Sequence, residues 1–164
     1  MDKKIKDGHK EVVITLLHVN YDKYLLQLRD FKSHIAFPGF WGGFGGQVEK
    51  GESPVMAGIR ELEEELGYSP DPISYFCDYF LDKETAKDNT DLHLHVCYGS
   101  LKVPVSDLIL TEGQDMGLFS RKEIVERQLY SKKLAENFPI PDHLVGIFCD
   151  FFKFISLEFQ CFSK

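Results

Sequence analysis

Residues 54–66 restrict what this chain can fold into more than any other segment does. Ser53 is a suitable N-cap, Pro54 suits the first helical position, and Gly67 can adopt the left-handed conformation that ends a helix. With a rotation of roughly 100° per residue, the apolar side chains fall in one narrow stripe, formed by Val55, Ile59, Leu62 and Leu66. The segment therefore predicts an amphipathic helix that packs on a core.

Three carboxylates share a second face of this helix. Glu61, Glu64 and Glu65 lie within about 100° of one another, whereas Glu63 points elsewhere. Their mutual repulsion and their position near the helix C-terminus are each unfavourable by a few tenths to about 1 kcal/mol. A divalent cation would offset that repulsion, and three oxygen ligands on one face suit Mg²⁺ or Mn²⁺. A solvated acidic face is the alternative.

The residues before the helix are rich in glycine. Residues 39–46 alternate glycine with aromatic side chains, and such a loop can present backbone amides and carbonyls to a ligand at close range. Arg60 lies on the flank of the acidic face, where it can orient a carboxylate. From the residues alone, a metal site and a solvated face both remain open.

Read as one string, residues 46–68 resemble the Nudix box, G-x5-E-x7-R-E-U-x-E-E-x-G-U, where U is aliphatic. The string is GQVEKGESPVMAGIRELEEELGY. The positions that match are Gly46, Glu52, Arg60, Glu61, Leu62, Glu64, Glu65 and Gly67. Tyr68 stands where an aliphatic residue is usual, and an aromatic ring can fill the same core position. The segments before and after the box, residues 24–30, 37–46 and 112–124, are also similar to the family.

The resemblance implies an α/β fold, a Nudix-type α/β/α sandwich around a mixed β-sheet. It also implies a pyrophosphohydrolase that cleaves a diphosphate bond in a nucleoside diphosphate linked to another moiety, with Mg²⁺ or Mn²⁺ as cofactor and water attacking phosphorus. Position by position, the metal ligands would be the carboxylates of Glu61, Glu64 and Glu65 and the carbonyl of Gly46.

Three further residues receive roles from the same resemblance. Arg60 would orient the glutamates, and Glu52 would support them by pairing or through metal-bound water. Some members of the family use a box glutamate as general base and others use one from a later loop. Glu112 is the later-loop candidate here, with Asp115 behind it.

Arg29, Trp41 and Phe44 are candidate substrate-binding residues. Arg29 ends a predicted strand and could grip a phosphate, although it could also be a surface arginine. Trp41 and Phe44, together with Phe40, could stack on a base or shape its pocket. The alternative for these aromatic residues is that they tuck into the core.

His93, His95 and Cys97 alternate along one predicted strand, which superficially suggests a zinc site. Positions i, i+2 and i+4 of an extended strand span roughly 13 Å, so the three side chains cannot all reach one ion. We expect instead a strand that faces substrate, or a polar sheet face that a helix covers.

The remaining pattern predicts alternating strands and helices in a single domain over residues 1–164. Residues 12–19 and 24–29 are predicted to form a hairpin, and residues 72–81, 92–101 and 116–119 are predicted to be strands. Residues 121–128 open a helix. After Pro139 and Pro141 a second amphipathic helix follows, with an apolar stripe formed by Leu144, Ile147, Phe148, Phe151, Phe152 and Ile155.

Charge and cysteine content limit the partners. The 164-residue chain has a net charge of -7, which argues against broad nucleic-acid binding and leaves a small-molecule ligand. The four cysteines, with no C-x-x-C spacing, are expected to be reduced thiols. With no apolar leader and no uninterrupted apolar stretch, we expect a cytoplasmic protein without membrane contact. A homodimer would be unsurprising by resemblance.

Two rival functions exist on the same fold. A non-catalytic nucleotide-ligand sensor would show eroded box carboxylates, and none is missing here. An isomerase of prenyl diphosphates would need a cysteine in the glycine loop and histidine ligands, and residues 39–46 contain neither. Nucleoside triphosphates, nucleotide sugars and smaller diphosphates all remain open as substrates.

Overall fold

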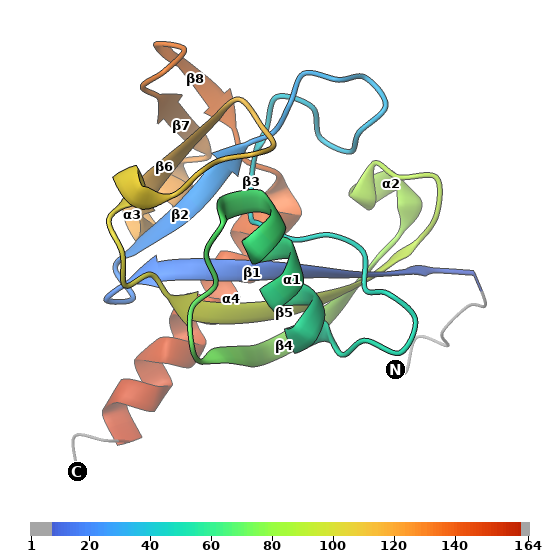
Figure 1. Ribbon diagram of the computed structural model, residues 1–164, viewed down its shortest axis with the longest axis horizontal. Coiled ribbons are helices and arrows are strands. Elements are labelled where there is room, and N and C mark those ends of the chain that lie inside the picture. The colour runs from blue at the N-terminus through green and yellow to red at the C-terminus, as the bar shows by residue number, and fades with distance from the viewer. Residues whose placement is uncertain (1–7, 162–164) are drawn as a thin grey trace.

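A mixed sheet of six strands forms the centre of the molecule (Figure 1). The computed structural model describes the backbone of residues 8–161 and the side chains of residues 8–158. The strands of the central sheet are β1 (Lys10–Val19), β2 (Lys23–Leu28), β3 (Trp41–Gly42), β4 (Ile73–Leu81), β5 (Leu92–Ser100) and β6 (Asp115–Ser120). Their order is β3-β2-β1-β5-β4. Strand β1 pairs with the first half of β2 and β3 pairs with its last two residues, whereas β6 pairs with the opposite edge of β2 along its whole length. Only β1 and β5 run parallel.

The two ends of β1 have different neighbours on the side that faces β2. The C-terminal end pairs with β2 from Leu17 to Val19, as the predicted hairpin requires. Toward its N-terminus, the amides of Thr15 and Val13 donate instead to the carbonyls of Phe44 and Gly46, each at 2.8 Å. This pairing places the glycine-rich loop against the middle of the sheet.

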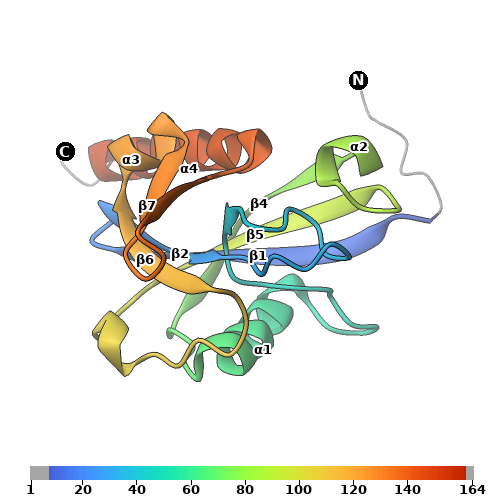
Figure 2. The ribbon, with the colours of Figure 1, turned by 90° about the horizontal axis from the view of Figure 1, so that it is seen from above.

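Helices cover both faces of the sheet (Figure 2). Helix α1 (Pro54–Leu66) packs on one face, where Leu62 and Leu66 join the buried side chains of β1 and β2. Helices α3 (Arg121–Glu126) and α4 (Asp142–Cys161) cover the other face, where Phe148 and Phe151 are fully buried. The predicted α/β/α sandwich around a mixed sheet is confirmed.

Several short elements escape the sequence pattern. Residues 82–91, expected to be only a polar connection, contain the short helix α2 (Lys83–Ala86), whose N-cap Asp82 accepts a bond from the Thr85 amide at 2.8 Å. The short helix η1 (Val105–Asp107), strand β3 and the separate hairpin of β7 (Gln128–Ser131) and β8 (Glu136–Pro139) were also not predicted. Segments this short carry no periodicity, and their conformation depends on the strands they meet.

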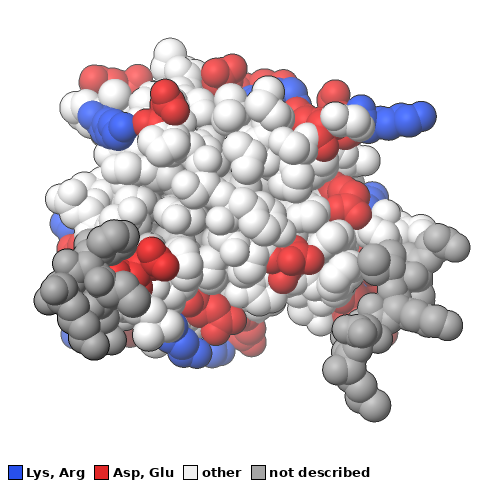
Figure 3. Space-filling view, turned by 90° about the horizontal axis from the view of Figure 1, so that it is seen from below, with Lys and Arg blue, Asp and Glu red and all other residues white. Residues whose placement is uncertain are grey.

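Cys77, Cys97 and Cys149 are free, and the side chain of Cys161 lies outside the described residues. On the face shown in Figure 3, acidic side chains are more widespread than basic ones around a largely uncharged centre. A search of the described helices found none with the length and apolar character needed to cross a bilayer.

Candidate active site

Helix α1 begins and ends where the sequence predicts. The Ser53 hydroxyl accepts a bond from the Met56 amide at 3.2 Å, and Pro54 occupies the first turn. Gly67 adopts the left-handed conformation with φ 63°, and its amide donates to the Glu63 carbonyl at 3.0 Å. With both ends set, the helix presents Arg60, Glu61 and Glu64 on the side away from the core.

Arg60 forms hydrogen bonds with several groups of the box. Its Nε and Nη2 donate to the two carboxylate oxygens of Glu52, each at 3.0 Å, and its Nη1 donates to Glu61 Oε1 at 2.7 Å. Nη2 also donates to the carbonyl of Gln47 at 2.9 Å. These bonds raise the pKa of the Arg60 guanidinium and lower the pKa of Glu52. The planar guanidinium of Arg60 therefore links Glu52, Glu61 and the Gln47 carbonyl in one hydrogen-bonded group.

Gly46 lies directly against the carboxylate of Glu61. A Cβ atom at this position would come within 2.5–2.7 Å of the Glu61 carboxylate atoms. The Gly46 carbonyl accepts the Val13 amide, and a carbonyl oxygen has a second lone pair for another partner. The backbone of Gly46 and the carboxylate of Glu61 are thus neighbours because this position has no side chain.

Glu65 is the buried member of the acidic face, with a residue exposure of 7%. Its Oε2 accepts a hydrogen bond from the backbone amide of Gly45 at 3.0 Å, and its Oε1 accepts one from the side-chain Nε2 of Gln27 at 3.1 Å. Burial raises the pKa of Glu65 to about 7, although the bonds from Gln27 and Gly45 act to lower it. Without a cation, this environment therefore favours the protonated form of Glu65 more than water does.

Glu64 differs from its neighbours because its side chain is 61% exposed, and its contact with Arg60 is long at 3.5 Å. The three box carboxylates do not converge on one point in this arrangement. Among the described side chains, the one group of three possible metal ligands whose ligand atoms all lie within 4.8 Å of one another is elsewhere in the molecule. Glu61 and Glu65 are held by hydrogen bonds, whereas Glu64 is free to turn.

The donor set fits a hard divalent cation. Carboxylates of Glu61, Glu64 and Glu65 and the carbonyl of Gly46 are all oxygen ligands, as Mg²⁺ and Mn²⁺ prefer. The buried, proton-favouring environment of Glu65 and the close approach of Gly46 to Glu61 are the observations that support this fit.

Replacing Arg60 with lysine tests whether the site needs the hydrogen bonds of the planar guanidinium. An ammonium cannot bridge Glu52, Glu61 and the Gln47 carbonyl in one plane, so Glu61 loses its orientation. We expect the kcat/KM for diphosphate hydrolysis to fall by about 10–100-fold, the usual cost of losing a partner that orients a ligand. Arg127→Lys, which alters a surface ion pair with Asp142, is the matched control. Equal activity of both variants would contradict the role of Arg60.

The raised pKa of Glu65 predicts how the stability of the metal-free protein depends on pH. The unfolded chain ionises this carboxyl near its ordinary 4.5 while the folded protein keeps its proton to about 7, so stability falls as pH rises between these values. At roughly 1.4 kcal/mol per pKa unit, the full loss is about 3 kcal/mol.

The comparison with Glu65→Gln isolates this effect. Burial lowers the pKa of His18 to about 4, which acts in the opposite direction below pH 6.5. The quantity to measure is therefore the urea unfolding free energy of wild type minus that of Glu65→Gln, in EDTA, between pH 5 and roughly pH 8. This difference should shift against wild type as pH rises, and a constant difference would refute the assignment.

A polar cavity of about 240 Å³ adjoins the box on the side of the loop before β6. Glu65, Glu112 and Arg29 line it together with Gln27 and Asp30. Glu112 is exposed and close enough to Glu65 to act on its charge. The structure thus brings Glu112 to the box, as the loop hypothesis needs.

Asp115 does not accompany Glu112. Its Oδ2 accepts the Ser131 hydroxyl at 2.6 Å and the Lys133 amide at 3.3 Å, so it holds the β7–β8 hairpin. The expectation that Asp115 stands behind Glu112 as a second candidate base is therefore wrong. The reason is local geometry, because Glu112 lies in the loop before β6, whereas Asp115 is the first residue of β6 and contacts the β7–β8 hairpin.

Arg29 lies between two cavities. It lines the polar cavity and a second, more apolar one of about 290 Å³, and its Nε donates to the Ala36 carbonyl at 2.8 Å. The second cavity also contacts the glycine loop at Gly45 and Gly46. Arg29 is thus a half-buried wall residue and not a freely solvated surface arginine.

Trp41 and Phe44 have no exposed surface. The Trp41 Nε1 donates to the Leu129 carbonyl at 2.9 Å and its ring packs edge-on against Phe119, while Phe44 belongs to the α1 core cluster. The prediction that these rings stack on a base is corrected here to a core role, because neither ring face is free. Trp41 still contributes an edge to the wall of the apolar cavity.

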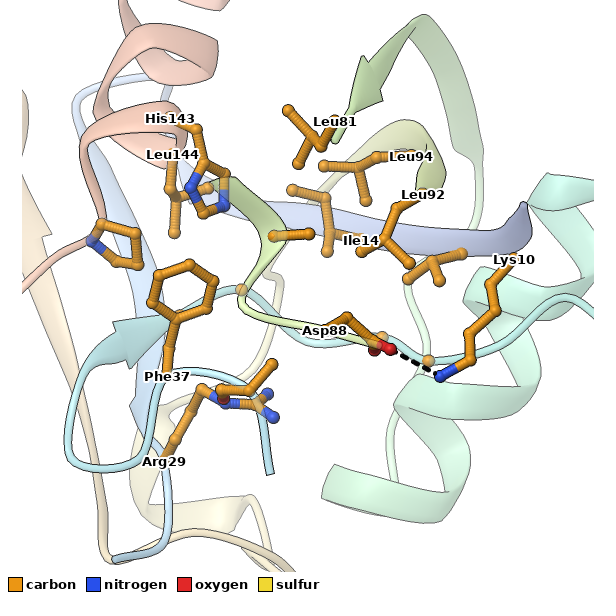
Figure 4. A pocket seen from close by; sticks show the side chains of 18 of the residues that line it. Lys10, Ile14, Arg29, Phe37, Leu81, Asp88, Leu92, Leu94, His143 and Leu144 are labelled. Carbon is orange, nitrogen blue, oxygen red and sulfur yellow. Dashed lines mark hydrogen bonds and ion pairs between the residues drawn. The ribbon is translucent and has the colours of Figure 1, made fainter. Parts of the chain in front are cut away.

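Phe37 and His143 were missed by sequence reasoning. They face the apolar cavity from the loop before β3 and from the start of α4, with ring centroids 5.0 Å apart (Figure 4). Leu92, Leu94 and Ile14 form the opposite wall, and Lys10 pairs with Asp88 at 2.8 Å at one end. The only signal was the aromatic content of the glycine loop, and nothing in the sequence links it to α4.

His93, His95 and Cys97, which alternate along β5, have different surroundings in the structure. Cys97 is buried with Val13 and Ala57 under α1, whereas His93 and His95 lie further along the same sheet face and bond to Glu11. His93 and His95 thus share one carboxylate neighbour, and Cys97 lies apart from them.

Comparison with known proteins gives consistent matches. The family model described as NUDIX domain matches residues 8–139. The chain is 35% identical over 75 residues to the m7GpppN-mRNA hydrolase NUDT17 of Xenopus laevis, covering 46% of this chain and 25% of that protein. It is 40% identical over 47 residues to an 8-oxo-dGTP diphosphatase of Proteus vulgaris, covering 29% of this chain and 40% of that protein. The matched segments thus span well under half the length of either relative.

Solved structures agree on the fold. The MutT protein from Methanosarcina mazei Go1 superposes with a TM-score of 0.70 at 18% identity, covering 93% of this chain and 99% of that one. At this level of identity the likeness concerns the fold.

Proposed function

This chain belongs to the Nudix hydrolase family, and from that premise we propose that it is a Mg²⁺- or Mn²⁺-dependent pyrophosphohydrolase of nucleoside diphosphate derivatives. The observation that carries the proposal is the complete box: Arg60 forks between Glu52 and Glu61, and Glu65 is buried against Gly45. A helix that only supported the core would gain nothing from this arrangement of charges. A cation site explains it.

The residues of this chain supply orientation and acid–base groups. Glu61, Glu64, Glu65 and the Gly46 carbonyl would hold the cation, which neutralises the diphosphate and polarises water when bound. Arg60 keeps Glu61 in position, and Glu52 keeps Arg60 in position. A diphosphate repels hydroxide, so a carboxylate must orient the attacking water and take its proton.

Glu112 is our candidate for that base. It lies in the polar cavity with Glu65 and Arg29, and its exposed position allows it to approach a water molecule at the box. Arg29, on the wall between the two cavities, would bind a phosphate of the substrate.

The apolar cavity suits the nucleoside. Phe37 and His143 present aromatic rings on one wall and Ile14 and Leu94 present aliphatic groups on the other, which is a suitable slot for a planar base. The Lys10–Asp88 pair at its end offers polar groups that can select among bases. The curated relatives act, by their names, on a capped mRNA and on an oxidised nucleotide. A nucleoside triphosphate is accordingly the first substrate class to test.

The test is hydrolysis of a panel of nucleoside triphosphates, ADP-ribose, nucleotide sugars and dinucleoside polyphosphates, with Mg²⁺ or Mn²⁺ and with EDTA. We expect release of phosphate or nucleotide from at least one class, abolished by EDTA. Thermal unfolding with and without Mg²⁺ provides a separate measure of the cation site. If Mg²⁺ raises the melting temperature and nothing is hydrolysed, the hydrolase proposal fails and the metal site stands.

A further inference from the structure

A second group of metal-ligand side chains lies on the sheet outside the candidate active site. Glu11 of β1 stands opposite His93 of β5, and His95 of β5 stands opposite Asp78 of β4. His9 precedes β1 and completes the group. We name these five residues the histidine cluster. Cys97, the next position of β5 on this face, is covered by α1, so the cluster begins where the helix stops covering the sheet.

The imidazole nitrogens of the cluster converge on one carboxylate. His9 Nε2 lies 2.7 Å from Glu11 Oε1, and His95 Nε2 lies 2.6 Å from Glu11 Oε2. His93 Nδ1 lies 3.1 Å from Oε1 and 3.0 Å from Oε2 of the same carboxylate. One ligand atom each from His9, Glu11 and His93 lies within 4.8 Å of the other two, and among the described side chains this is the one such group.

His93 has more acceptors around it than a neutral ring can serve. Its Nε2 lies 2.6 Å from Asp78 Oδ2 while its Nδ1 faces Glu11. A neutral imidazole carries one N–H, so it donates to one of these carboxylates and presents a lone pair to the other. When Nε2 donates to Asp78, a cation between Nδ1 and Glu11 satisfies both lone pairs. With a cation there, Asp78 and His93 would be the carboxylate and the histidine of a carboxylate–histidine–metal triad.

The neighbours of the cluster hold its rings in place. His95 Nδ1 lies 3.2 Å from the Tyr75 hydroxyl, and the Phe80 ring stacks on His93 with centroids 4.2 Å apart. The side chains of His93 and His95 are 16% and 11% exposed. The ligand atoms are therefore preorganised, with the side chain of Glu11, 39% exposed, at the solvent side.

We propose that His9, Glu11 and His93 form a second cation site, specific for a transition-metal ion such as Zn²⁺, with Asp78 and His95 as positioning residues. Two imidazoles and one carboxylate leave a fourth tetrahedral position for water. Imidazole ligands favour Zn²⁺ over Mg²⁺, whereas the all-oxygen box favours Mg²⁺. The two sites are thus separated by ligand chemistry, and this proposal does not depend on hydrolysis.

The site would act as a clamp on the sheet. It joins the start of β1 to β5 directly and to β4 through Asp78. The backbone carbonyl of Glu11 also accepts the Val48 amide at 2.9 Å, so the clamped strand end supports the loop that leads into α1. A Zn²⁺ ion should therefore stabilise the protein while leaving the box free for Mg²⁺.

The experiment is titration of the metal-free full chain with Zn²⁺ in the presence of excess Mg²⁺. Calorimetry measures the binding, and thermal unfolding measures the change in stability. We expect one Zn²⁺ per chain and a higher melting temperature. His9→Gln with His93→Gln should weaken binding by more than about 100-fold, and Asp78→Asn by about 10–100-fold, as loss of an outer-shell partner does. His34→Gln, at an exposed loop histidine, and Glu64→Gln, in the box, should bind Zn²⁺ as wild type does.

Co²⁺ provides a second measurement on wild type, independent of how the variants fold. A tetrahedral nitrogen–oxygen site gives intense visible absorption bands, whereas Co²⁺ in an octahedral oxygen site gives weak ones. Binding that is unchanged in the double variant, or that disappears in Glu64→Gln, would overturn the proposal. So would a failure of wild type to bind Zn²⁺ when Mg²⁺ is present, which would leave the cluster as a hydrogen-bonded network.

Discussion

Glu64→Gln is expected to abolish hydrolysis while leaving the fold intact. Glu64 is the most exposed of the three box carboxylates, and its contact with Arg60 at 3.5 Å contributes little to stability. As a cation ligand, however, it supplies a charge that an amide cannot replace. We expect kcat/KM to fall by at least about 100-fold, more than the loss of an outer-shell partner costs. Initial rates at saturating Mg²⁺ measure the effect.

Glu63→Gln is the matched control. Glu63 is adjacent in sequence, exposed and of the same charge, but it points away from the box. The two variants therefore remove the same charge from the same helix on different faces. Full activity in Glu63→Gln with loss in Glu64→Gln assigns the effect to the box, and the urea midpoints of both should match wild type. Equal activity of the two variants would remove Glu64 from the mechanism.

Gly45→Ala is expected to destabilise the protein more than alanine at any other glycine, because its added Cβ would make the shortest contact. A Cβ at this position would lie 2.0 Å from the Val13 carbonyl oxygen, and the residue has φ +147°, which side chains rarely adopt. The neighbouring atoms belong to the β1 backbone, so they cannot move aside cheaply. We expect a loss of about 3 kcal/mol or more in the free energy of unfolding, from overpacking and backbone strain together. Urea denaturation measures it.

Gly146→Ala provides the comparison. Gly146 lies in α4 and is exposed, and apart from its chain neighbours and the adjacent helix backbone no atom lies within 4 Å of the position its Cβ would take. Alanine there should stabilise the protein by about 0.5–1 kcal/mol through helix propensity. The same chemical change thus has opposite signs at the two sites. A Gly45→Ala midpoint equal to that of wild type would show that the loop need not approach β1 as closely as described.

Residues near each other in sequence were predicted well. Ser53, Pro54 and Gly67 define α1 through local hydrogen bonds and backbone conformation, and these depend on the helix alone. The carboxylates of Glu61, Glu64 and Glu65 share a face because helical geometry requires it. The apolar stripe of α4 predicted a core helix for the same reason, and Phe148 and Phe151 are buried as expected. The resemblance of residues 46–68 then supplied the family.

Contacts between distant segments were not predictable in this way. The core role of Trp41 depends on a carbonyl of β7, and the burial of Glu65 depends on Gln27 of β2. Asp115 turned toward Ser131 because a hairpin that the pattern did not predict lies beside it. None of these partners is close enough in the chain to leave a periodic signal.

What the sequence determined by itself is the helix, its charged face, the core stripe of α4 and the family, because each depends on spacing within one segment. The tertiary structure alone decided which box carboxylate is buried, which aromatic residues line a cavity, and that His9, Glu11 and His93 meet. The physical reason is that strand pairing sets these neighbours. The parallel register of β1 and β5 places Glu11 opposite His93, although the two lie far apart in the chain.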